Sequence, residues 1–428
     1  MPKLSDSRIS RFLLLLFSFC LLISKPLYSS YALIPMDKTQ TNHLKAYGVA
    51  YSALVKGVTM EWLLNYRGGS FLIPFYTDLD QECLLRGVRI EIIPDATRLQ
   101  ILDEIARPEV NMDAIKMEKA PKIAVYAPED KQPWDDAVMM ALEYAEIPYD
   151  RIYDTEIIEG RLKDYDWLHL HHEDFTGQYG RFFKTFNNMA WYQKQVADNE
   201  AMAARHGFSK VSQMKLYVAL TIKAYVADGG FLFSMCSGAD SFDIALAAQN
   251  IDICASMYDG DPADPDMNSK LSFRETLAFQ NFKLMEDPLE YEFSEIDATQ
   301  SRRIAQNQDY FTLFDYSAKW DPVPTMLCQN HTRIVKGFMG QTTAFIKDYI
   351  KPSVLIMGEN HSLNEARYIH GEYGRGTWTF YGGHDPEDYS HLVGDEQTDL
   401  ALYPNSPGYR LILNNVLFPA AKKKKQKT

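Results

Sequence analysis

The sequence predicts an α/β protein with a parallel sheet flanked by helices, an N-terminal α/β extension and an acidic insertion. Short apolar runs with helical periodicity between them are the first observation, because this alternation is typical of parallel sheets. The second is length, since 428 residues with 46% apolar content suffice for two or three domain-sized units. The third is a cluster of acidic turns near residue 260, which interrupts the alternation.

The first residues predict an export signal. Lys3, Arg8 and Arg11 precede an apolar run over 12–23, and Ser30-Tyr31-Ala32 places small residues where a signal peptidase cuts. The run is too short to span a bilayer comfortably. We therefore expect residues 1–32 to be a signal peptide cleaved near Ala32. The product would be periplasmic or secreted and have no integral membrane span, with an uncleaved anchor as the alternative.

The mature chain divides into an N-terminal region and a larger domain. Residues 33–118 predict an alternating α/β region, with 107–121 as a connection between prolines. Its expected helices are 37–57, 78–85 and 96–105, and its expected strands are 58–66, 71–75 and 88–93. Residues 119–421 form the larger domain, with an insertion at about 255–320, and 422–428 are a basic tail.

The larger domain alternates strands with helices. Its expected strands are 122–126, 150–157, 165–172, 229–235, 352–357 and 376–381. Its expected helices are one that follows Pro133-Trp134 and ends near Tyr144, and those at 211–228, 240–249 and 409–417. The acidic loop at 259–266 could bind calcium, but its spacing does not match an EF-hand, and a solvated loop is the simpler interpretation.

Charge and cysteine content exclude several functions. A net charge of −13 without a basic stripe argues against a nucleic-acid partner. After cleavage the cysteines are Cys83, Cys236, Cys254 and Cys328, too few and too widely spaced for a disulfide framework. No CxxC pair supports a structural zinc. We assign no cofactor and no metal.

Cys236 occupies the turn around which the chain is organised. The strand over 229–235 ends just before it, and the next helix begins at about Asp240. Such a turn exposes a side chain at the carboxyl end of a sheet, beside the positive end of a helix. We expect the Cys236 thiol to ionise more easily than a free thiol.

His384 is the candidate base for Cys236. Both residues follow predicted strands, and the ends of parallel strands meet at one edge of a sheet. An imidazole can take the proton of a thiol, and a carboxylate can orient the imidazole. Glu387 is our first choice for that carboxylate, ahead of Asp385 and Asp388. The alternative is that Cys236 is a small buried hydrophobe and that His384 opens a turn.

A second polar cluster, from His169 to Asp174, ends the strand over 165–172. We expect the N–H of Ser237 to be one oxyanion donor, and the loop that starts at His172 to supply the second. His171, His172 and Glu173 are thus predicted to bind substrate. A metal site built on His171, His172 and a carboxylate is the less favoured alternative, because adjacent residues of a strand point in opposing directions.

The motifs resemble the class I glutamine amidotransferase-like superfamily, in which a Gly-x-Cys-x-Gly turn and a later His-Pro-Glu form the site. Here the two segments read Ser234-Met235-Cys236-Ser237-Gly238 and Gly383-His384-Asp385-Pro386-Glu387. The stretch over 373–385 is also similar to the trehalose-utilisation (ThuA-like) branch. The resemblance covers roughly residues 120–420 and implies a flavodoxin-like sheet with a cysteine nucleophile.

The whole chain, including residues 42–48 and 62–71, resembles exported Bacteroidota proteins named asparagine synthetase B. That resemblance implies ATP-dependent amidation of aspartate with glutamine as nitrogen donor. Residues 237–241, Ser-Gly-Ala-Asp-Ser, are similar to the pyrophosphate loop of such enzymes.

Three functions therefore follow as hypotheses. The first is a cysteine-dependent hydrolase or amidotransferase acting on amide or acyl groups of a small molecule. The second is a non-catalytic carbohydrate-binding module with a cleft of aromatic residues, namely Trp167, Phe175, Tyr179, Trp378 and Tyr381. The third is asparagine synthesis.

Overall fold

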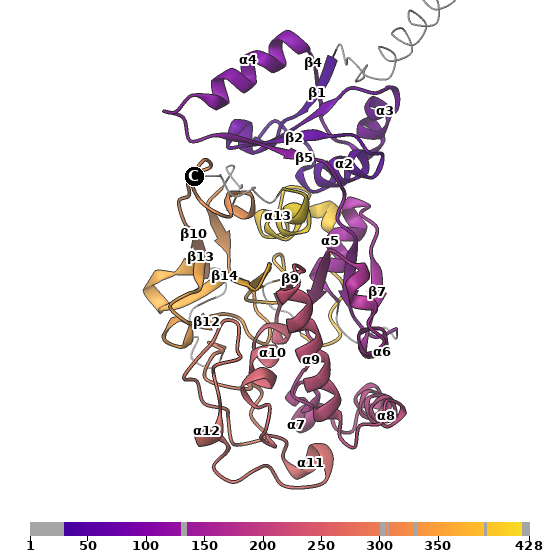
Figure 1. The fold of residues 1–428 in the computed structure, drawn as a ribbon, viewed down its shortest axis with the longest axis vertical. Coiled ribbons are helices and arrows are strands. Elements are labelled where there is room, and N and C mark those ends of the chain that lie inside the picture. The colour runs from indigo at the N-terminus through magenta and orange to yellow at the C-terminus, as the bar shows by residue number, and fades with distance from the viewer. Residues whose placement is uncertain are drawn as a thin grey trace, which may run out of the picture.

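A computed structural model gives the structure of the chain and describes residues 30–129, 135–299, 305, 308–327, 332–388 and 392–421. Two sheets organise these residues, and helices flank both (Figure 1). The first sheet has five strands and lies at the top of Figure 1, and the second has ten strands and lies below it. The predicted α/β class is confirmed.

The first sheet is antiparallel throughout, in the order β4-β1-β3-β2-β5. Its strands are β1 Ser30–Ile34, β2 Met60–Leu64, β3 Ser70–Pro74, β4 Glu91–Pro94 and β5 Asp113–Met117. Alternate residues face opposite sides. Leu33 and Leu72 pack with Ile101 of one covering helix, whereas Trp62 and Phe71 join the main core on the other side.

Two strands of this sheet were not predicted. β1 lies partly in the expected signal peptide, and Ala32 is fully buried within it, so cleavage after Ala32 would remove three of the strand's five residues. The remainder of that signal, 1–29, lies outside the described residues. β5 lies in the expected connection, because only Ile115 and Met117 of its residues are buried and its apolar pattern is short. The expected alternating region is therefore an antiparallel sheet.

The second sheet is parallel on one side and antiparallel on the other. The parallel strands follow the order β7-β6-β8-β9-β15. They are β6 Ile123–Tyr126, β7 Asp150–Ile152, β8 Trp167–Leu170, β9 Phe231–Met235 and β15 Gly376–Tyr381. The antiparallel strands are β10 Tyr310–Leu313, β11 Ile334–Lys336, β12 Phe345–Ile346, β13 Leu355–Asn360 and β14 Glu365–Tyr373.

Helices cover both sheets. The α-helices are α2 His43–Val55, α3 Thr77–Arg86, α4 Asp95–Ala106, α5 Ala137–Ala145, α6 Asp154–Ile158, α7 Phe183–Phe186, α8 Ala190–Arg205, α9 Val211–Ala227, α10 Ser237–Ala247, α11 Ser256–Asp259, α12 Met267–Lys270 and α13 Pro407–Ala421. The 3-10 helices are Tyr66–Gly68, Arg161–Asp164, Tyr179–Arg181, Pro324–Leu327, Lys347–Tyr349, His361–Leu363 and Leu400–Leu402. Among the described residues, no helix is both long enough and apolar enough to cross a membrane.

Several boundaries in the larger domain differ from the predictions. The strand expected over 150–157 ends at Ile152 and gives way to α6. The helices α7, α8, α11 and α12 and the strands β10, β11, β12 and β14 were not predicted. β14 was missed because it carries polar residues, including Arg367, which is fully buried and reaches Asp309 Oδ2 at 2.7 Å. The tail at 422–428 and Cys328 lie outside the described residues.

The terminal helix α13 joins the two sheets. Arg410 in this helix is fully buried, and its guanidinium donates to the carbonyls of Met36 and Gly68 in the N-terminal region. Tyr47 of α2 donates to Asn414 Oδ1 at 2.5 Å. Because these buried polar groups are satisfied across the boundary, the N-terminal region is packed onto the larger domain.

Candidate functional site

The turn at Cys236 has a strained backbone. β9 ends at Met235 and α10 begins at Ser237, and the φ and ψ angles of Cys236 are 47° and −144°. Glycine is the residue that adopts such angles at little cost, and other residues there store roughly 1–3 kcal/mol of strain. The Cys236 N–H donates to the Gly383 carbonyl at 3.1 Å. The pairing of β9 with β15 thus brings Cys236 and the segment before His384 together, as predicted.

The thiol of Cys236 is harder to ionise than expected. Its residue is 3% exposed, and burial raises the pKa of the thiol to about 12, although the backbone N–H of Ser237 opposes that rise. The prediction of easier ionisation is therefore wrong for this structure, because loss of hydration outweighs the helix N-terminus.

A backbone carbonyl group at the start of the loop after β8 points toward α10. The Gly238 N–H donates to the His171 carbonyl at 2.5 Å, and a Cβ at Gly238 would lie 2.3 Å from that oxygen. The His171 carbonyl, just before the loop expected to supply the second oxyanion donor, thus accepts a bond from α10, and only glycine fits at position 238. The Ser237 N–H remains beside the thiol, as the influence of Ser237 on the Cys236 pKa shows.

His384 lies among other histidines. It is 3% exposed, and its ring centroid is 4.7 Å from that of His171 and 5.7 Å from that of His172. Glu387, the carboxylate that we expected to orient it, accepts a hydrogen bond from the Ser406 hydroxyl at the start of α13. The Glu387 carboxylate is thus bonded at the start of α13, and another carboxylate lies beside the histidines.

That carboxylate is Asp136, which was not predicted. Its Oδ1 lies 3.3 Å from His169 Nε2 and 3.3 Å from His171 Nδ1. Burial works to raise the pKa of Asp136, but the two imidazoles hold it well below its usual range. Asp136 also caps α5 by accepting from the backbone N–H of Val138. The sequence signal for Asp136 is its position just before the Ala-Val-Met-Met run. That position is typical of a helix cap and does not indicate a contact with the histidines.

The histidines form two overlapping groups that could hold a metal. Donor atoms of His171, His172 and His384 all lie within 4.8 Å of one another, and so do those of Asp136, His169 and His171. A metal site on His171 and His172 was the less favoured prediction, because adjacent residues of a strand point in opposing directions. β8 ends at Leu170, however, so that rule does not apply to His171 and His172.

Two buried acids lie close to Cys236. Burial, followed by the charge of Asp297, raises the pKa of Asp240 well above its usual range. Burial also raises the pKa of Asp297 to about 7. Asp297 Oδ2 accepts from the Thr342 N–H at 2.8 Å, and the Thr342 carbonyl accepts from Gly383 N–H at 2.9 Å. Asp297 lies in the insertion, so its distance along the sequence concealed this contact.

Glu173 belongs to a separate buried network. Its Oε2 accepts from the Tyr153 hydroxyl at 3.1 Å, and Lys215 Nζ donates to the same hydroxyl at 3.1 Å. Lys215 also pairs with Asp154 at 2.8 Å, and both side chains are at most 4% exposed. The structure thus places Glu173 in a structural ion-pair network behind the site.

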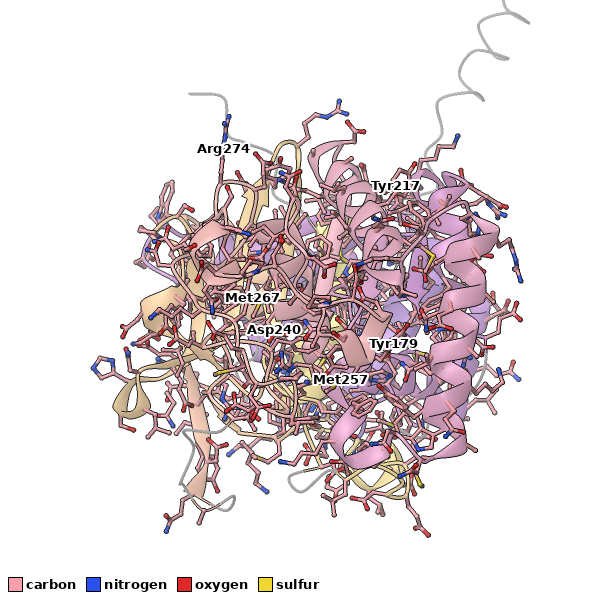
Figure 2. The ribbon with its side chains drawn as sticks, turned by 90° about the horizontal axis from the view of Figure 1, so that it is seen from below. Tyr179, Tyr217, Asp240, Met257, Met267 and Arg274 are labelled. Atoms are coloured by element: carbon pink, nitrogen blue, oxygen red, sulfur yellow. The ribbon has the colours of Figure 1, made fainter. Side chains whose placement is uncertain are left out.

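The insertion covers the carboxyl edge of the sheet. Arg181, in the loop after β8, donates to the carbonyls of Met285, Asp287 and Glu290. The Asp243 carboxylate of α10 accepts three backbone N–H groups from 277–279. Figure 2 views the molecule from this end, where α11 and α12 carry the labelled Met257 and Met267. These contacts close the edge that holds Cys236.

Two surface predictions change as a result. The five aromatic residues expected to line a glycan cleft are each at most 5% exposed, so the predicted aromatic cleft is wrong. They are Trp167, Phe175, Tyr179, Trp378 and Tyr381.

The acidic loop at 259–266 pairs with a lysine from outside the loop. Lys210 Nζ contacts Asp252, Asp259 and Asp261 at 2.5, 3.0 and 2.6 Å. A lysine ammonium therefore already pairs with two of the aspartates of that loop.

A large cavity lies at the opposite edge of the sheet. It has a volume of about 1170 Å³ and lies between the N-terminal region and the starts of the parallel strands. Its lining includes Lys116, Asp166, Gly230, Trp320 and Thr377. The candidate catalytic residues named above do not line it.

No family model and no curated protein matches the chain. Among solved structures, cytoplasmic protein STM3548 from Salmonella typhimurium has a TM-score of 0.34 at 11% identity, covering 71% of this chain and 100% of its own. Cytoplasmic protein STM1381 from Salmonella typhimurium LT2 gives 0.31 at 13% identity, with the same coverages. Gan42B, a GH42 beta-galactosidase, gives 0.27 at 10% identity, covering 62% and 28%. These scores are too low to identify a function.

Proposed function

We propose that the chain is a thiol-dependent hydrolase or transferase of amide or other acyl groups, with Cys236 as nucleophile. The strained backbone of Cys236 is the observation that carries this proposal. A cysteine retained at angles that favour glycine, at a junction of strand and helix, is the arrangement that presents a nucleophile in hydrolases of α/β fold.

The proposed reaction uses residues from three segments of the carboxyl edge. Cys236 Sγ attacks the acyl carbon as its proton passes to His384, and the Ser237 N–H stabilises the oxyanion. His384 then gives the proton to the leaving amine or alcohol. Water or an acceptor amine attacks the resulting thioester and frees Cys236. His171 and His172 border the imidazole of His384 and form the adjoining wall of the site.

The covered thiol implies that the site opens for substrate. The insertion is fastened by Arg181 and Asp243, so it must move before an acyl group can reach Cys236. Opening would also restore hydration near the thiol and lower its pKa toward the ordinary range.

The strand order supports a flavodoxin-like arrangement with this chemistry. In chain order the parallel strands are arranged 2-1-3-4-5, the flavodoxin-like order, in which ligands bind outside the carboxyl ends of the strands. This order supports the resemblance to class I glutamine amidotransferase-like and ThuA-like proteins. Export through an N-terminal signal remains part of the proposal and implies a periplasmic or secreted product, with the buried residues of β1 favouring cleavage before Ser30 over cleavage after Ala32.

The other two functions lack a supporting observation. Residues 237–241, proposed as a pyrophosphate loop by resemblance to asparagine synthetases, form the buried first turns of α10. A glycan site would need exposed aromatic side chains, which the proposed set does not provide.

Hydrolysis of p-nitrophenyl acetate, and ammonia release from glutamine and asparagine, test the proposal in the presence of a chelator. We expect turnover that Cys236→Ala abolishes, that His384→Ala lowers by on the order of 10²–10⁴-fold, and that Cys254→Ala leaves unchanged. Cys254 is the matched control because it is also a buried free thiol. Turnover that survives Cys236→Ala would refute the proposal.

A further inference from the structure

We propose that His171, His172 and His384 bind a divalent transition metal of the zinc class, with Asp136 positioning His171. The site goes beyond the proposed hydrolase function, and it does not depend on whether Cys236 reacts.

The spacing of the three rings fits a single ion. Bonds of about 2.0–2.1 Å from zinc to nitrogen, arranged tetrahedrally, place imidazole centroids on the order of 5 Å apart. The observed centroid separations are 4.7 Å for His171 and His172, 4.7 Å for His171 and His384, and 5.7 Å for His172 and His384. Ordinary packing does not require three imidazoles to converge in this way, and their donor atoms lie within 4.8 Å of one another.

His171 is oriented for ligation through Nε2. Its Nδ1 lies 3.3 Å from Asp136 Oδ1, so Nε2 is on the far side of the ring. The residue is 1% exposed, and within the described part of the chain its Nε2 has no hydrogen-bond partner. A buried ring nitrogen without a partner is costly, and a metal bond would satisfy it. A carboxylate on the opposite ring nitrogen is the usual support of a ligating histidine.

Asp136 is held in place independently of the ion. Its Oδ1 accepts from the backbone N–H groups of Val138 and Met139 at 2.8 and 2.9 Å, which anchors the carboxylate to the start of α5. These two bonds already use the oxygen that faces the histidines. Asp136 therefore fits the role of a supporting residue better than that of a direct ligand.

The ion would be a borderline Lewis acid with an open coordination position. Neutral imidazoles favour zinc, copper, nickel or iron over calcium and magnesium. Three histidines leave a fourth position for water or a substrate oxygen. His172 is only partly buried, which gives the ion a route to the site. Because His384 would use its lone pair on the ion, metal binding and proton transfer from Cys236 exclude each other.

Titration of the full chain, freed of metal by EDTA and dialysis, tests the site directly. Zn²⁺ binding is measured by calorimetry, and Co²⁺ binding by the visible absorption of a tetrahedral ion. We expect one equivalent of each metal to bind. His172→Gln and His384→Gln should each weaken binding by more than about 100-fold, and Asp136→Asn by roughly 10–100-fold. His361→Gln is the matched control, since His361 is a surface histidine with a 90% exposed side chain, and it should bind as the wild type does.

The outcomes separate this site from its alternatives. Absence of binding, or binding unchanged in both His172→Gln and His384→Gln, would overturn the proposal. Binding lost in His169→Gln but kept in His172→Gln would place the ion in the other histidine group and would also overturn it. Thermal unfolding verifies that each variant is folded, and two ligand variants in separate loops keep the test decisive if one unfolds. Since binding is read without turnover, its failure is distinct from failure of the hydrolase proposal.

Discussion

The two edges of the parallel sheet differ in what they contain. At the carboxyl edge, Cys236, His171 and His384 are each at most 3% exposed, and the insertion lies over them. At the amino edge, a cavity of about 1170 Å³ opens beside lysines and the 76% exposed Trp320. Figure 1 shows the separation, with the N-terminal region at one end of the sheet and α11 and α12 at the other.

The difference teaches that a cavity and the reactive side chains can lie at opposite edges of the same sheet. Parallel strands deliver their polar loops to the carboxyl edge, so chemistry collects there whether or not a cavity is present. The amino edge receives the loops that return from helices, and here it provides the junction with the N-terminal region. A search that starts from this cavity would therefore select the edge without the cysteine.

The largest expected effect concerns the ion pair that braces the carboxyl edge. Lys215→Met should lower the free energy of unfolding by about 3–5 kcal/mol, because it leaves the buried Asp154 charge without its cation. Chemical denaturation measures the change. Lys194→Met is the control, since the pair of Lys194 with Asp198 is 58% exposed on each side and should contribute less than about 1 kcal/mol. Equal losses in the two variants would mean that this edge is not braced.

A pH-dependent effect should distinguish the buried acids of the same edge. Burial and Asp297 raise the pKa of Asp240 in the folded state, so its contribution to stability is full below the unfolded pKa near 4 and is lost as pH rises through the raised value. Asp240→Asn removes this loss. The variant should therefore gain thermal stability over wild type at pH 8 and gain less at pH 5. A gain that is the same at both pH values would show that Asp240 does not titrate as described.

A smaller effect tests backbone strain at the nucleophile. Cys236→Gly should be about 1 kcal/mol more stable than Cys236→Ala, because glycine adopts the φ of 47° without strain. At an ordinary helical position the order is reversed, and exposed Ala204 of α8 is the control, where Ala204→Gly should cost roughly 1 kcal/mol. Denaturation of the two Cys236 variants measures the difference. A glycine variant less stable than the alanine variant would remove the argument for strain.

Sequence patterns located the elements of the parallel sheet because those strands are apolar and bounded by turns. They also placed Cys236 and His384 at one edge, since that follows from strand direction alone. They failed for β14, whose buried Arg367 pairs with Asp309, because a polar strand lacks the apolar signal.

The rest of the site depends on contacts that local sequence does not encode. Asp136 and Asp297 reach the site from a helix cap and from the insertion, and only tertiary packing shows their partners. The burial of Cys236 has the same origin, because the covering segment lies more than forty residues away along the chain. Glu387 was chosen by proximity in sequence, and its bond to the Ser406 hydroxyl likewise appears only in the structure.

The most direct test of the thiol-dependent function compares how fast three cysteines of the same molecule are acylated. Cys83, Cys236 and Cys254 are each at most 3% exposed, and burial raises the pKa of all three thiols. The folded chain is treated with p-nitrophenyl acetate in the presence of a chelator, and peptide mass spectrometry locates the acetyl group. We predict acetylation at Cys236 well before the other two, with His384→Ala slowing it. Equal acetylation of all three, or acetylation of Cys83 or Cys254 first, would contradict the account.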